Sequence, residues 1–168
     1  MQEITIDKTS DTVQTMLLEK DTIRTEPNGL TPEIYASVRK SVGMKEYNRE
    51  DVETALQNTL FSVVIREKEQ PIGIGRVIGD GRIAFFIKDV AIIPERQGQG
   101  IGIMIMEKLM EYIHNAGAAN AYAGLMALKG TESFYKKFGF HVRPYQKEGS
   151  GMTQYLNEHT DETLIIQV

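Results

Sequence analysis

The sequence predicts an α+β domain in which a mixed, mostly antiparallel central sheet carries helices on both faces. Two observations carry this prediction. Three long apolar runs follow one another with only short polar turns between them, which is typical of an antiparallel meander. A helical pattern then leads to one further apolar run, which indicates a strand–helix–strand unit.

Two helices are expected before the meander, and both carry start signals. Thr31 can cap the first helix, Pro32 occupies its first position, and Gly43 follows its last turn. Asn48 begins the second helix, with acidic residues in its first turn. Upstream, "EITI" and "TMLLEKDTIRTE" are interpreted as extended segments whose pairing stays open. The apolar positions expected to face inward are Tyr35, Val38, Val42, Val52, Ala55 and Leu56.

The meander is expected to consist of strands over residues 60–67, 70–79 and 82–93. Polar residues 67–70 make the first hairpin, and Gly79-Asp80-Gly81 makes the second. A broadly apolar helix over residues 98–114 and a strand over 120–128 come next. Further elements are expected as a helix at 131–140 that Gly139 stops and Phe140 caps with an apolar contact, and strands at 141–146 and 152–156.

Composition limits the class of protein. The chain has 168 residues, of which 41% are hydrophobic and 25% charged, and we expect a single domain over residues 1–168. Its core covers about residues 27–156, and residues 157–168 form an extra strand or a tail. The net charge of −4 argues against a nucleic-acid partner. The chain has no cysteine, and no apolar stretch is long enough for a membrane span, so a cytoplasmic location is expected.

The stretch "PERQGQGIG" raises the question of what approaches its backbone. Three glycines, at 98, 100 and 102, precede an apolar helix, although glycine is unfavourable inside regular elements. At a helix N-terminus the unpaired N–H groups and the positive end of the helix dipole favour an anion. Glycines allow successive N–H groups to turn toward one phosphate.

Three known explanations for such a glycine-rich stretch do not fit this sequence well. The dinucleotide motif G-x-G-x-x-G fails because its third glycine would fall at Ile103. The P-loop fails because no Gly-Lys-Ser/Thr ending occurs. A glycine-rich turn that only lets strand and helix pack closely explains one or two glycines, but not the neighbouring Gln97 and Arg96.

Residues 97–102, "QGQGIG", resemble the Q/R-x-x-G-x-G/A motif of the GCN5-related N-acetyltransferase (GNAT) superfamily, which binds the pyrophosphate of acetyl-coenzyme A. Residues 133–140, "SFYKKFGF", resemble its F-Y-x-x-x-G-F signature. The resemblance covers residues 60–145 well. The arrangement "GRVIGDG…DVAIIPERQGQGIG" is similar to the branch that includes plant serotonin N-acetyltransferases and uncharacterised bacterial enzymes. This resemblance implies the GNAT acyl-CoA acyltransferase fold and acetyl-CoA as co-substrate, with no metal.

The resemblance also implies a binding site for the coenzyme. The pantetheine arm would lie along the strand of Val90, Ala91 and Ile92 as an added strand does. That strand must then part from its parallel neighbour. The amides of the loop would hold the pyrophosphate, and Arg96 would either add charge or only be solvated. The cofactor-binding residues implied are Val90, Ala91, Ile92, Arg96, Gln97, Gly98, Gln99, Gly100, Ile101, Gly102, Ser133 and Tyr135.

Two residues are candidates for the chemistry. Tyr135 matches the family tyrosine that stands near the thiolate, where it acts as general acid or stabilises the sulfur by a hydrogen bond; alternatively it is one more core aromatic. Asp89 lies in an apolar row with Phe85, Ile87, Ala91 and Ile93, so it either serves as base or amine ligand, or pairs with Arg76 across the hairpin. A bulge near residue 90 would change that row. His141 and His114 are weaker candidates.

The expected reaction is transfer of the acetyl group from acetyl-CoA to the primary amine of a small molecule, by direct attack in a ternary complex. The absence of cysteine favours direct attack over an acyl-enzyme. The alternatives are a protein or peptide amine as acceptor, or a non-catalytic CoA-binding interaction module. Tyr35 and Phe86 are candidate substrate residues within an aromatic set that also holds Tyr47, Phe61 and Tyr145; alternatively, these aromatics belong to the core. A homodimer is expected because exposed strand edges often pair.

Overall fold

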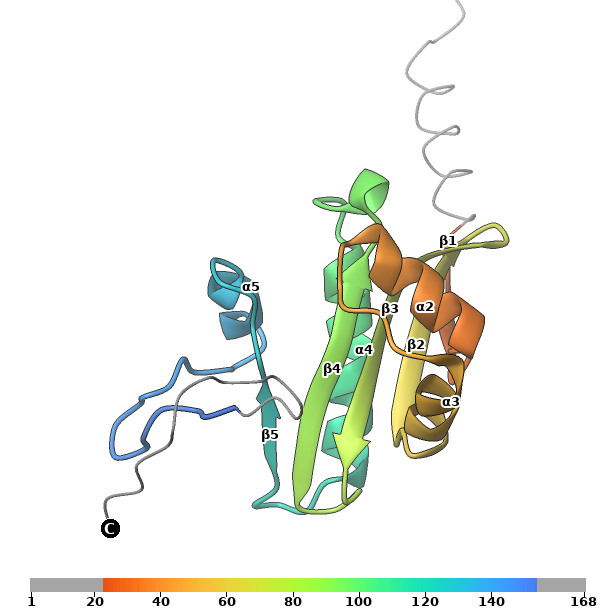
Figure 1. Ribbon diagram of the computed structural model, residues 1–168. Helices are drawn as coiled ribbons and strands as arrows, with labels where there is room; N and C mark the ends of the chain where they lie inside the picture. Colours follow the sequence, from red (N-terminus) through yellow and green to blue (C-terminus); the bar gives the residue numbers. More distant parts are fainter. Residues whose placement is uncertain (1–22, 154–168) are drawn as a thin grey trace, which may run out of the picture. The chain divides into compact units, whose positions relative to one another are not determined.

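The protein was studied as a computed structural model, and the structure describes residues 23–153. The chain divides into two compact units, residues 1–128 and 129–168, and each is described by itself. The first unit contains a five-stranded sheet in the order β1-β2-β3-β4-β5 (Figure 1). The first four strands are antiparallel neighbours, and β5 is parallel to β4. The strands are β1 (Ile23–Pro27), β2 (Phe61–Glu67), β3 (Gln70–Gly79), β4 (Ala84–Ile92) and β5 (Tyr122–Leu125).

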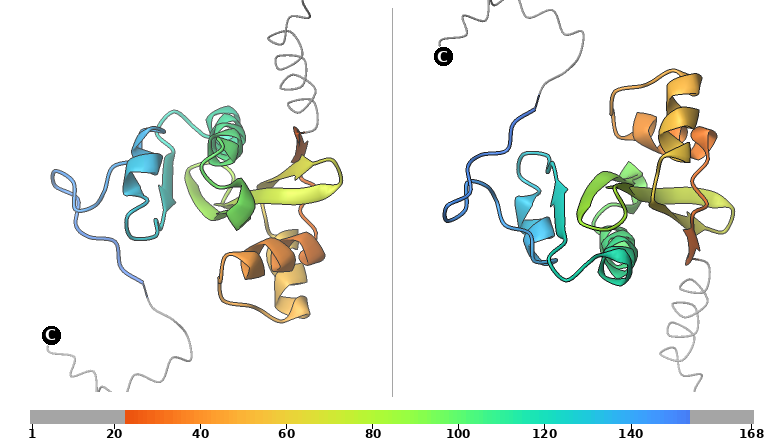
Figure 2. Two further views of the ribbon diagram at one scale, coloured as in Figure 1. Left: turned by 90° about the horizontal axis from the view of Figure 1, so that it is seen from above. Right: turned by 90° about the horizontal axis from the view of Figure 1, so that it is seen from below.

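Helices cover both faces of this sheet (Figure 2). Helices α2 (Pro32–Ser41) and α3 (Arg49–Gln57) lie on one face, and α4 (Ile101–Ala116) lies on the other. The expected start signals are confirmed. The Thr31 hydroxyl accepts a hydrogen bond from the Ile34 N–H at 3.3 Å, and the Asn48 side chain accepts one from the Asp51 N–H at 2.8 Å. The α+β class with helices on both faces is therefore confirmed.

Each face of the sheet has its own apolar core. On the α2 and α3 face the buried residues are Tyr35, Val38, Val52, Val64, Ile74 and Ala91. On the other face, α4 buries Ile101, Ile105, Met106, Leu109 and Ile113. The helix over residues 98–114 was expected to be buried broadly, but its burial is limited to one face, because Ile103 is 41% exposed.

Helix α4 lies unusually close to β3 because two residues of that strand have no side chain. A Cβ atom on Gly73 would lie 2.9 Å from Ile101 Cγ2, and one on Gly75 would lie 2.5 Å from Ile105 Cγ2. Contacts this short do not occur between real carbon atoms, so the two glycines let the helix approach. This close packing positions the N-terminus of α4 beside the end of β4.

Both hairpin turns are where the sequence predicts them. Glu67 pairs with Gln70 across the first turn. In the second, Asp80 accepts hydrogen bonds from the N–H groups of Arg82, Ile83 and Ala84, at 2.8, 2.8 and 3.1 Å. Of the segment "TMLLEKDTIRTE", residues 23–26 belong to β1 and pair antiparallel with β2, and the rest lies outside the described residues.

The second unit contains a short helix, α5 (Glu132–Lys136), which a left-handed glycine stops. Gly139 has φ +85°, its N–H donates to Lys136 O, and the Phe140 N–H donates to Tyr135 O. The rings of Tyr135 and Phe140 lie 6.5 Å apart, edge to face. These contacts confirm the stop signal and the closing contact expected of Gly139 and Phe140.

The strand expected at residues 141–146 is wrong. The structure has no strand there; Tyr145 and Glu148 form one isolated bridge around a tight turn. Pro144 has no N–H for a strand ladder, and residues 141–150 are exposed, so there is little burial to hold a strand. Residues 152 and 153 are not in a strand either, and the rest of the strand expected at 152–156, with "EITI" and the tail 157–168, lies outside the described residues.

No helix within residues 23–153 is long and apolar enough to cross a membrane.

Candidate active site

A β-bulge near the end of β4 defines the site. Ile74 of β3 faces Ala91, but Arg76 faces Lys88, so Asp89 and Val90 share the place opposite Gly75. Asp89 has φ +57°, in the left-handed region. The bulge changes which face of the sheet each side chain occupies.

The apolar row expected for Asp89 is therefore wrong. Before the bulge, Phe85 packs edge to face against Tyr112 of α4. After it, Ala91 and Ile93 belong to the core on the α2 and α3 face. The two halves of the expected row thus lie on opposite faces, and Asp89 reaches the α2 side. A bulge near residue 90 was expected to change the row in this way.

Beyond the bulge, β4 parts from its parallel neighbour. The pairing of β4 with β5 covers residues 84–87 of β4 and ends at the pair Ile87 and Leu125. Residues 88–92 therefore have no partner on the β5 side within the described chain. An unpaired strand edge of this kind can pair with an extended amide-bearing ligand.

The loop between β4 and α4 starts directly where this edge ends. A 3₁₀ turn, Pro94–Arg96, leads into Gln97, and α4 begins at Ile101 with Gly100 as its cap. Gly98 and Gly100 have φ +73° and +86°, a conformation that glycine adopts without strain. No atom lies within 4 Å of a Cβ built on either glycine, so the space beside the loop is open.

The N–H groups of this loop are available to a ligand. Among the described residues, Gly98, Gln99 and Gly100 donate no backbone hydrogen bond. Ile101 and Gly102 are the first two residues of α4, whose N–H groups have no partner inside the helix. Five consecutive amides therefore stand at the positive end of a helix dipole, which is an arrangement suited to phosphate.

The side chains of the loop fold back and leave it open. The Gln97 amide donates to Ile92 O at 3.0 Å, and the Gln99 amide donates to Glu95 O at 2.9 Å. Arg96 forms an ion pair with Glu67 at 2.5 Å, so this arginine is engaged rather than merely solvated. Its positive charge is thereby partly compensated before any phosphate arrives.

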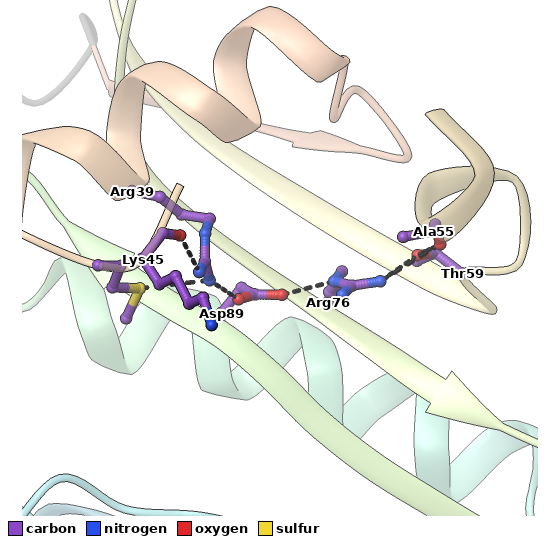
Figure 3. A network of polar contacts seen from close by, with 7 residues as sticks. Arg39, Lys45, Ala55, Thr59, Arg76 and Asp89 are labelled. Carbon is purple, nitrogen blue, oxygen red and sulfur yellow. Dashed lines mark hydrogen bonds and ion pairs between the residues drawn. The ribbon is translucent and has the colours of Figure 1, made fainter. Parts of the chain in front are cut away.

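On the α2 side of the bulge, two arginines hold Asp89 between them (Figure 3). One carboxylate oxygen accepts a hydrogen bond from Arg39 Nη1, and the other accepts one from Arg76 Nε at 2.6 Å. Asp89, Arg39 and Arg76 have side chains that are 3%, 10% and 9% exposed. The pairing of Asp89 with Arg76, one of the two alternatives above, is therefore present.

The network is anchored at both ends. Arg39 Nη2 donates to Lys45 O at 2.9 Å. Arg76 Nη1 donates to Thr59 Oγ1 at 3.1 Å and to Ala55 O at 3.3 Å. Charged groups this deeply buried are tolerated because each has paired hydrogen bonds. The network therefore ties α2 and α3 to the bulge of β4.

Two tyrosines flank the network. The Arg39 guanidinium lies 4.9 Å from the ring centre of Tyr35 and 5.3 Å from that of Tyr47. Burial raises the pKa of Tyr35 above its usual 10, and the Asp89 charge adds to this, while the two arginines oppose it. The Tyr35 phenol is thus protonated at neutral pH.

A cavity of about 330 Å³ opens onto this network. It lies between α2, α3 and the strands β3 and β4, directly beside the bulge. Its lining combines charged, aromatic and small apolar side chains: Tyr35, Arg39, Tyr47, Asp51, Val52, Ala55, Arg76, Lys88 and Asp89.

Of the aromatic residues expected together, the structure brings only two to this cavity. Tyr35 and Tyr47 line it. Phe61 stacks on Tyr112 of α4, with ring centres 4.9 Å apart, so of the two alternatives expected for it the core position is present. Phe86 lies against Gly124 of β5 and does not line the cavity. Tyr145 lies in the second unit, stacked on His141 at 4.3 Å.

Tyr135 and Ser133 lie on α5 in the second unit. The ring of Tyr135 contacts Phe134 at 5.0 Å, edge to face. Burial raises the pKa of Tyr135 above its usual 10, so its hydroxyl keeps its proton at neutral pH. His114 is an exposed residue near the end of α4.

Sequence reasoning missed Arg39. The signal was present, because Arg39 occupies the same helical face as Tyr35, Val38 and Val42 in an otherwise apolar stripe. A charged residue inside such a stripe requires a buried counter-charge. Within residues 23–153 there is no group of three or more histidine, aspartate or glutamate side chains placed to hold a metal ion.

Comparison with known proteins gives consistent matches. Residues 58–142 match the family described as the acetyltransferase (GNAT) domain. The chain is 31% identical to the chloroplastic GCN5-related N-acetyltransferase 1 of Arabidopsis thaliana and 27% identical to the chloroplastic serotonin N-acetyltransferase 2 of rice. Each alignment covers 73% of this chain, and the chain spans 62% of the length of each plant protein.

Solved structures agree with these matches. A probable acetyltransferase of unknown function from Staphylococcus aureus is 38% identical, with a TM-score of 0.72 over 79% of this chain and 98% of its own. A GNAT family protein from Streptococcus pneumoniae is 24% identical and has a TM-score of 0.67 over 81% of this chain and 99% of its own.

Proposed function

This chain belongs to the GNAT acetyltransferase family, and on that premise we propose that it transfers the acetyl group of acetyl-CoA to the primary amine of a small molecule. The family, expected from two short motifs, and the plant and bacterial branch, expected from the arrangement "GRVIGDG…DVAIIPERQGQGIG", are confirmed by the matches. The identity of the acceptor and the catalytic activity itself are the proposal.

The observation that carries the proposal is the continuous backbone surface from the bulge to α4. Val90, Ala91 and Ile92 present an edge without a β5 partner, and the open loop follows directly. We propose that the edge pairs with the pantetheine amides and that the five free amides of residues 98–102, with Gln97 before them, bind the pyrophosphate. Arg96 adds charge there only in part, because it is paired with Glu67.

The proposed step is direct attack in a ternary complex. Bound acetyl-CoA supplies a thioester. The neutral amine nitrogen forms a bond to the acetyl carbon, the carbon–sulfur bond breaks, and the sulfur leaves as thiolate. The amine proton passes to solvent, and the thiolate takes a proton or a hydrogen bond from the Tyr135 hydroxyl. We propose this role for Tyr135 and a coenzyme contact for Ser133.

Asp89 is poorly placed to receive the amine proton directly. Both of its oxygens are engaged by guanidinium groups, and its side chain is 3% exposed. An amine would have to displace Arg39 or Arg76 to reach it. We propose that Asp89 instead holds the two arginines beside the bulge, while a role as base stays a prediction. Tyr35, which lines the cavity, and Phe86 stay predicted substrate residues.

A small acceptor is favoured over a protein by the cavity. Its volume of about 330 Å³ lies at the lower end of the range of roughly 300–1,000 Å³ that is typical of small-molecule pockets. Calorimetric titration with CoA tests coenzyme binding, and release of free thiol with a panel of small amines and lysine peptides tests transfer. CoA binding without turnover on any amine would favour a non-catalytic module, and turnover on peptides alone would favour a protein acceptor.

Substitution of Tyr135 by phenylalanine tests the proposed acid. Tyr135→Phe removes only the hydroxyl, so we expect kcat to fall about 10²-fold or more with CoA affinity changed less than about threefold. Because the raised pKa of Tyr135 lies above 10, the phenol stays protonated up to that pH. Loss of kcat from phenol ionisation is therefore expected only above pH 10.

The matched control is Tyr122→Phe, which alters a tyrosine that is 59% exposed on β5. An unchanged kcat in Tyr135→Phe would remove the proposed role.

The cytoplasmic location and the homodimer stay predictions, and the plant relatives are named as chloroplastic proteins.

A further inference from the structure

The cavity beside the bulge is lined by more positive than negative charge. Arg39, Arg76 and Lys88 supply three cations, and Asp51 and Asp89 supply two carboxylates. Asp89 pairs with both arginines, so the buried network has two positive charges and one negative charge, and its net charge is +1. Lys88 forms no ion pair with any described residue, and neither does Asp51 on the first turn of α3.

The buried Arg76 also has hydrogen-bond donors that no described residue accepts from. Arg76 uses Nε for Asp89 and Nη1 for Ala55 and Thr59, while Nη2 donates to none of the described residues. No fully buried side-chain nitrogen or oxygen among the described residues lacks a partner, so Nη2 reaches accessible space. Arg76 is one of the residues that line the cavity, and its guanidinium lies 5.5 Å from the ring centre of Tyr35, another lining residue.

Such a lining selects against a second cation and for an anion. A guanidinium edge that is nine-tenths buried forms strong, charge-assisted hydrogen bonds to carboxylate or phosphate oxygens. An additional ammonium group would meet the excess positive charge at low dielectric. The same field disfavours protonation of the reacting amine, and the neutral amine is its nucleophilic form.

We propose that the acceptor carries an anionic group, a carboxylate or a phosphate, together with its primary amine, and that Arg76 and Lys88 bind this group in the cavity. The inference rests on the proposed function for the placement of the amine beside the coenzyme. Lys88 and Asp89 directly precede Val90, so the cavity adjoins the strand edge assigned to the pantetheine. The tyrosine rings at 35 and 47 orient Arg39 and supply an apolar wall.

The test compares acceptors that differ only in the anionic group. L-phenylalanine is paired with 2-phenylethylamine, phosphoethanolamine with ethanolamine, and 1,4-diaminobutane serves as the dication. The readouts are kcat/KM from thiol release and saturable binding to the CoA-loaded protein by NMR titration. We expect at least one acid-bearing member to exceed its partner by about tenfold or more, and the diamine to be the poorest acceptor. The pair that responds distinguishes carboxylate from phosphate.

A charge variant ties the preference to the cavity. Lys88→Gln removes an exposed charge, so the fold is expected to persist, and the preference for the acid-bearing partner should fall about threefold, mainly through KM. Lys108→Gln on the opposite face of the sheet, where Lys108 pairs with Glu111, should leave the preference unchanged. An equal loss in both variants would contradict the assignment to the cavity.

The outcomes separate the two proposals. Saturable binding of an acid-bearing probe that Lys88→Gln weakens, without turnover of any amine, would support the anion site and overturn the transferase. Turnover that is best with 2-phenylethylamine or the diamine would support the transferase and overturn the anion site. Failure of every acid-bearing probe to bind or react would also overturn the anion site.

Discussion

The glycine loop before α4 and the arginine network at the bulge are the two proposed binding surfaces, and they are built from different parts of the chain. The loop presents backbone amides from consecutive residues, and its side chains fold away from the opening. The network presents side chains from α2, β3 and β4, and its most distant hydrogen-bonded partners are 50 positions apart in sequence. A ligand common to a whole family suits the first construction, because backbone amides do not depend on side-chain identity. A ligand that differs between relatives suits the second.

The comparison predicts that the network is the more fragile of the two in stability. Asp89→Asn keeps the shape and tolerates the left-handed conformation at φ +57°, but leaves two buried guanidinium groups without their counter-charge. We expect the free energy of unfolding to fall by about 3–5 kcal/mol, measured by urea denaturation. Glu111→Gln, at an exposed ion pair, should change it by less than about 0.5 kcal/mol.

A loss that large can unfold a small domain, so a second variant is needed. Arg39→Met added to Asp89→Asn removes one of the two uncompensated cations and should recover part of the lost stability. If the double variant is less stable than Asp89→Asn alone, electrostatic compensation is not what holds this region together.

The loop should respond in affinity rather than in stability. Gly100→Val forces a β-branched residue to adopt φ +86°, at a cost of roughly 1–3 kcal/mol, although no neighbouring atom obstructs it. Relief of that strain moves the free amides, so we expect CoA affinity to fall about tenfold or more in calorimetry.

Gly43→Val is the matched control, because Gly43 has φ +69° and equally open surroundings at the end of α2. It should lower stability by a similar amount and leave CoA affinity unchanged. Equal loss of CoA affinity in both variants would show that strain anywhere in the fold, rather than the loop, controls coenzyme binding.

The smallest effect is expected at Asp80, an exposed carboxylate that binds backbone amides as the loop is proposed to do for phosphate. Its pKa is lowered from 3.8 by hydrogen bonds from the N–H groups of Arg82, Ile83 and Ala84. A lowered folded-state pKa means that the stabilisation is complete above the unfolded value and is lost as pH falls through the folded value. Asp80→Ala should therefore lower the thermal midpoint slightly at pH 7, and the difference from the unsubstituted protein should shrink well below pH 3.8. A difference that is constant with pH would assign the effect to the turn backbone alone.

The sequence predicts the local parts of this architecture well. Strand β3 covers the predicted residues 70–79, and both helix caps at Thr31 and Asn48 are found. These features depend on neighbouring residues: a cap needs one side chain and the next turn, and a hairpin needs a short polar turn. The glycine loop before α4 was equally predictable, because its three glycines lie at alternate positions within one short stretch of the sequence.

The arginine network and the cavity beside the bulge were less predictable, because the residues that form them are far apart in the sequence. The bulge at Asp89 and Val90 depends on the register with β3, and no single strand sequence records that register. The sequence left two places open for Phe61, the cavity or the core, because the face that a strand presents follows from pairing rather than from residue type. The strand was wrongly expected at residues 141–146 because Pro144, which cannot donate to a strand ladder, was not counted against it.

The bulge has one consequence for how this strand tolerates change in length. Because one extra residue switches the side chains after it to the other side, the first half of β4 supplies the core beneath α4 and the second half supplies the core beneath α2. Deleting Val90 alone would restore a regular zigzag in which Ala91 keeps its place opposite Ile74, while Asp89 would turn from the α2 side toward α4. A single-codon deletion here would therefore leave both apolar layers in register and deprive Arg39 and Arg76 of their shared carboxylate.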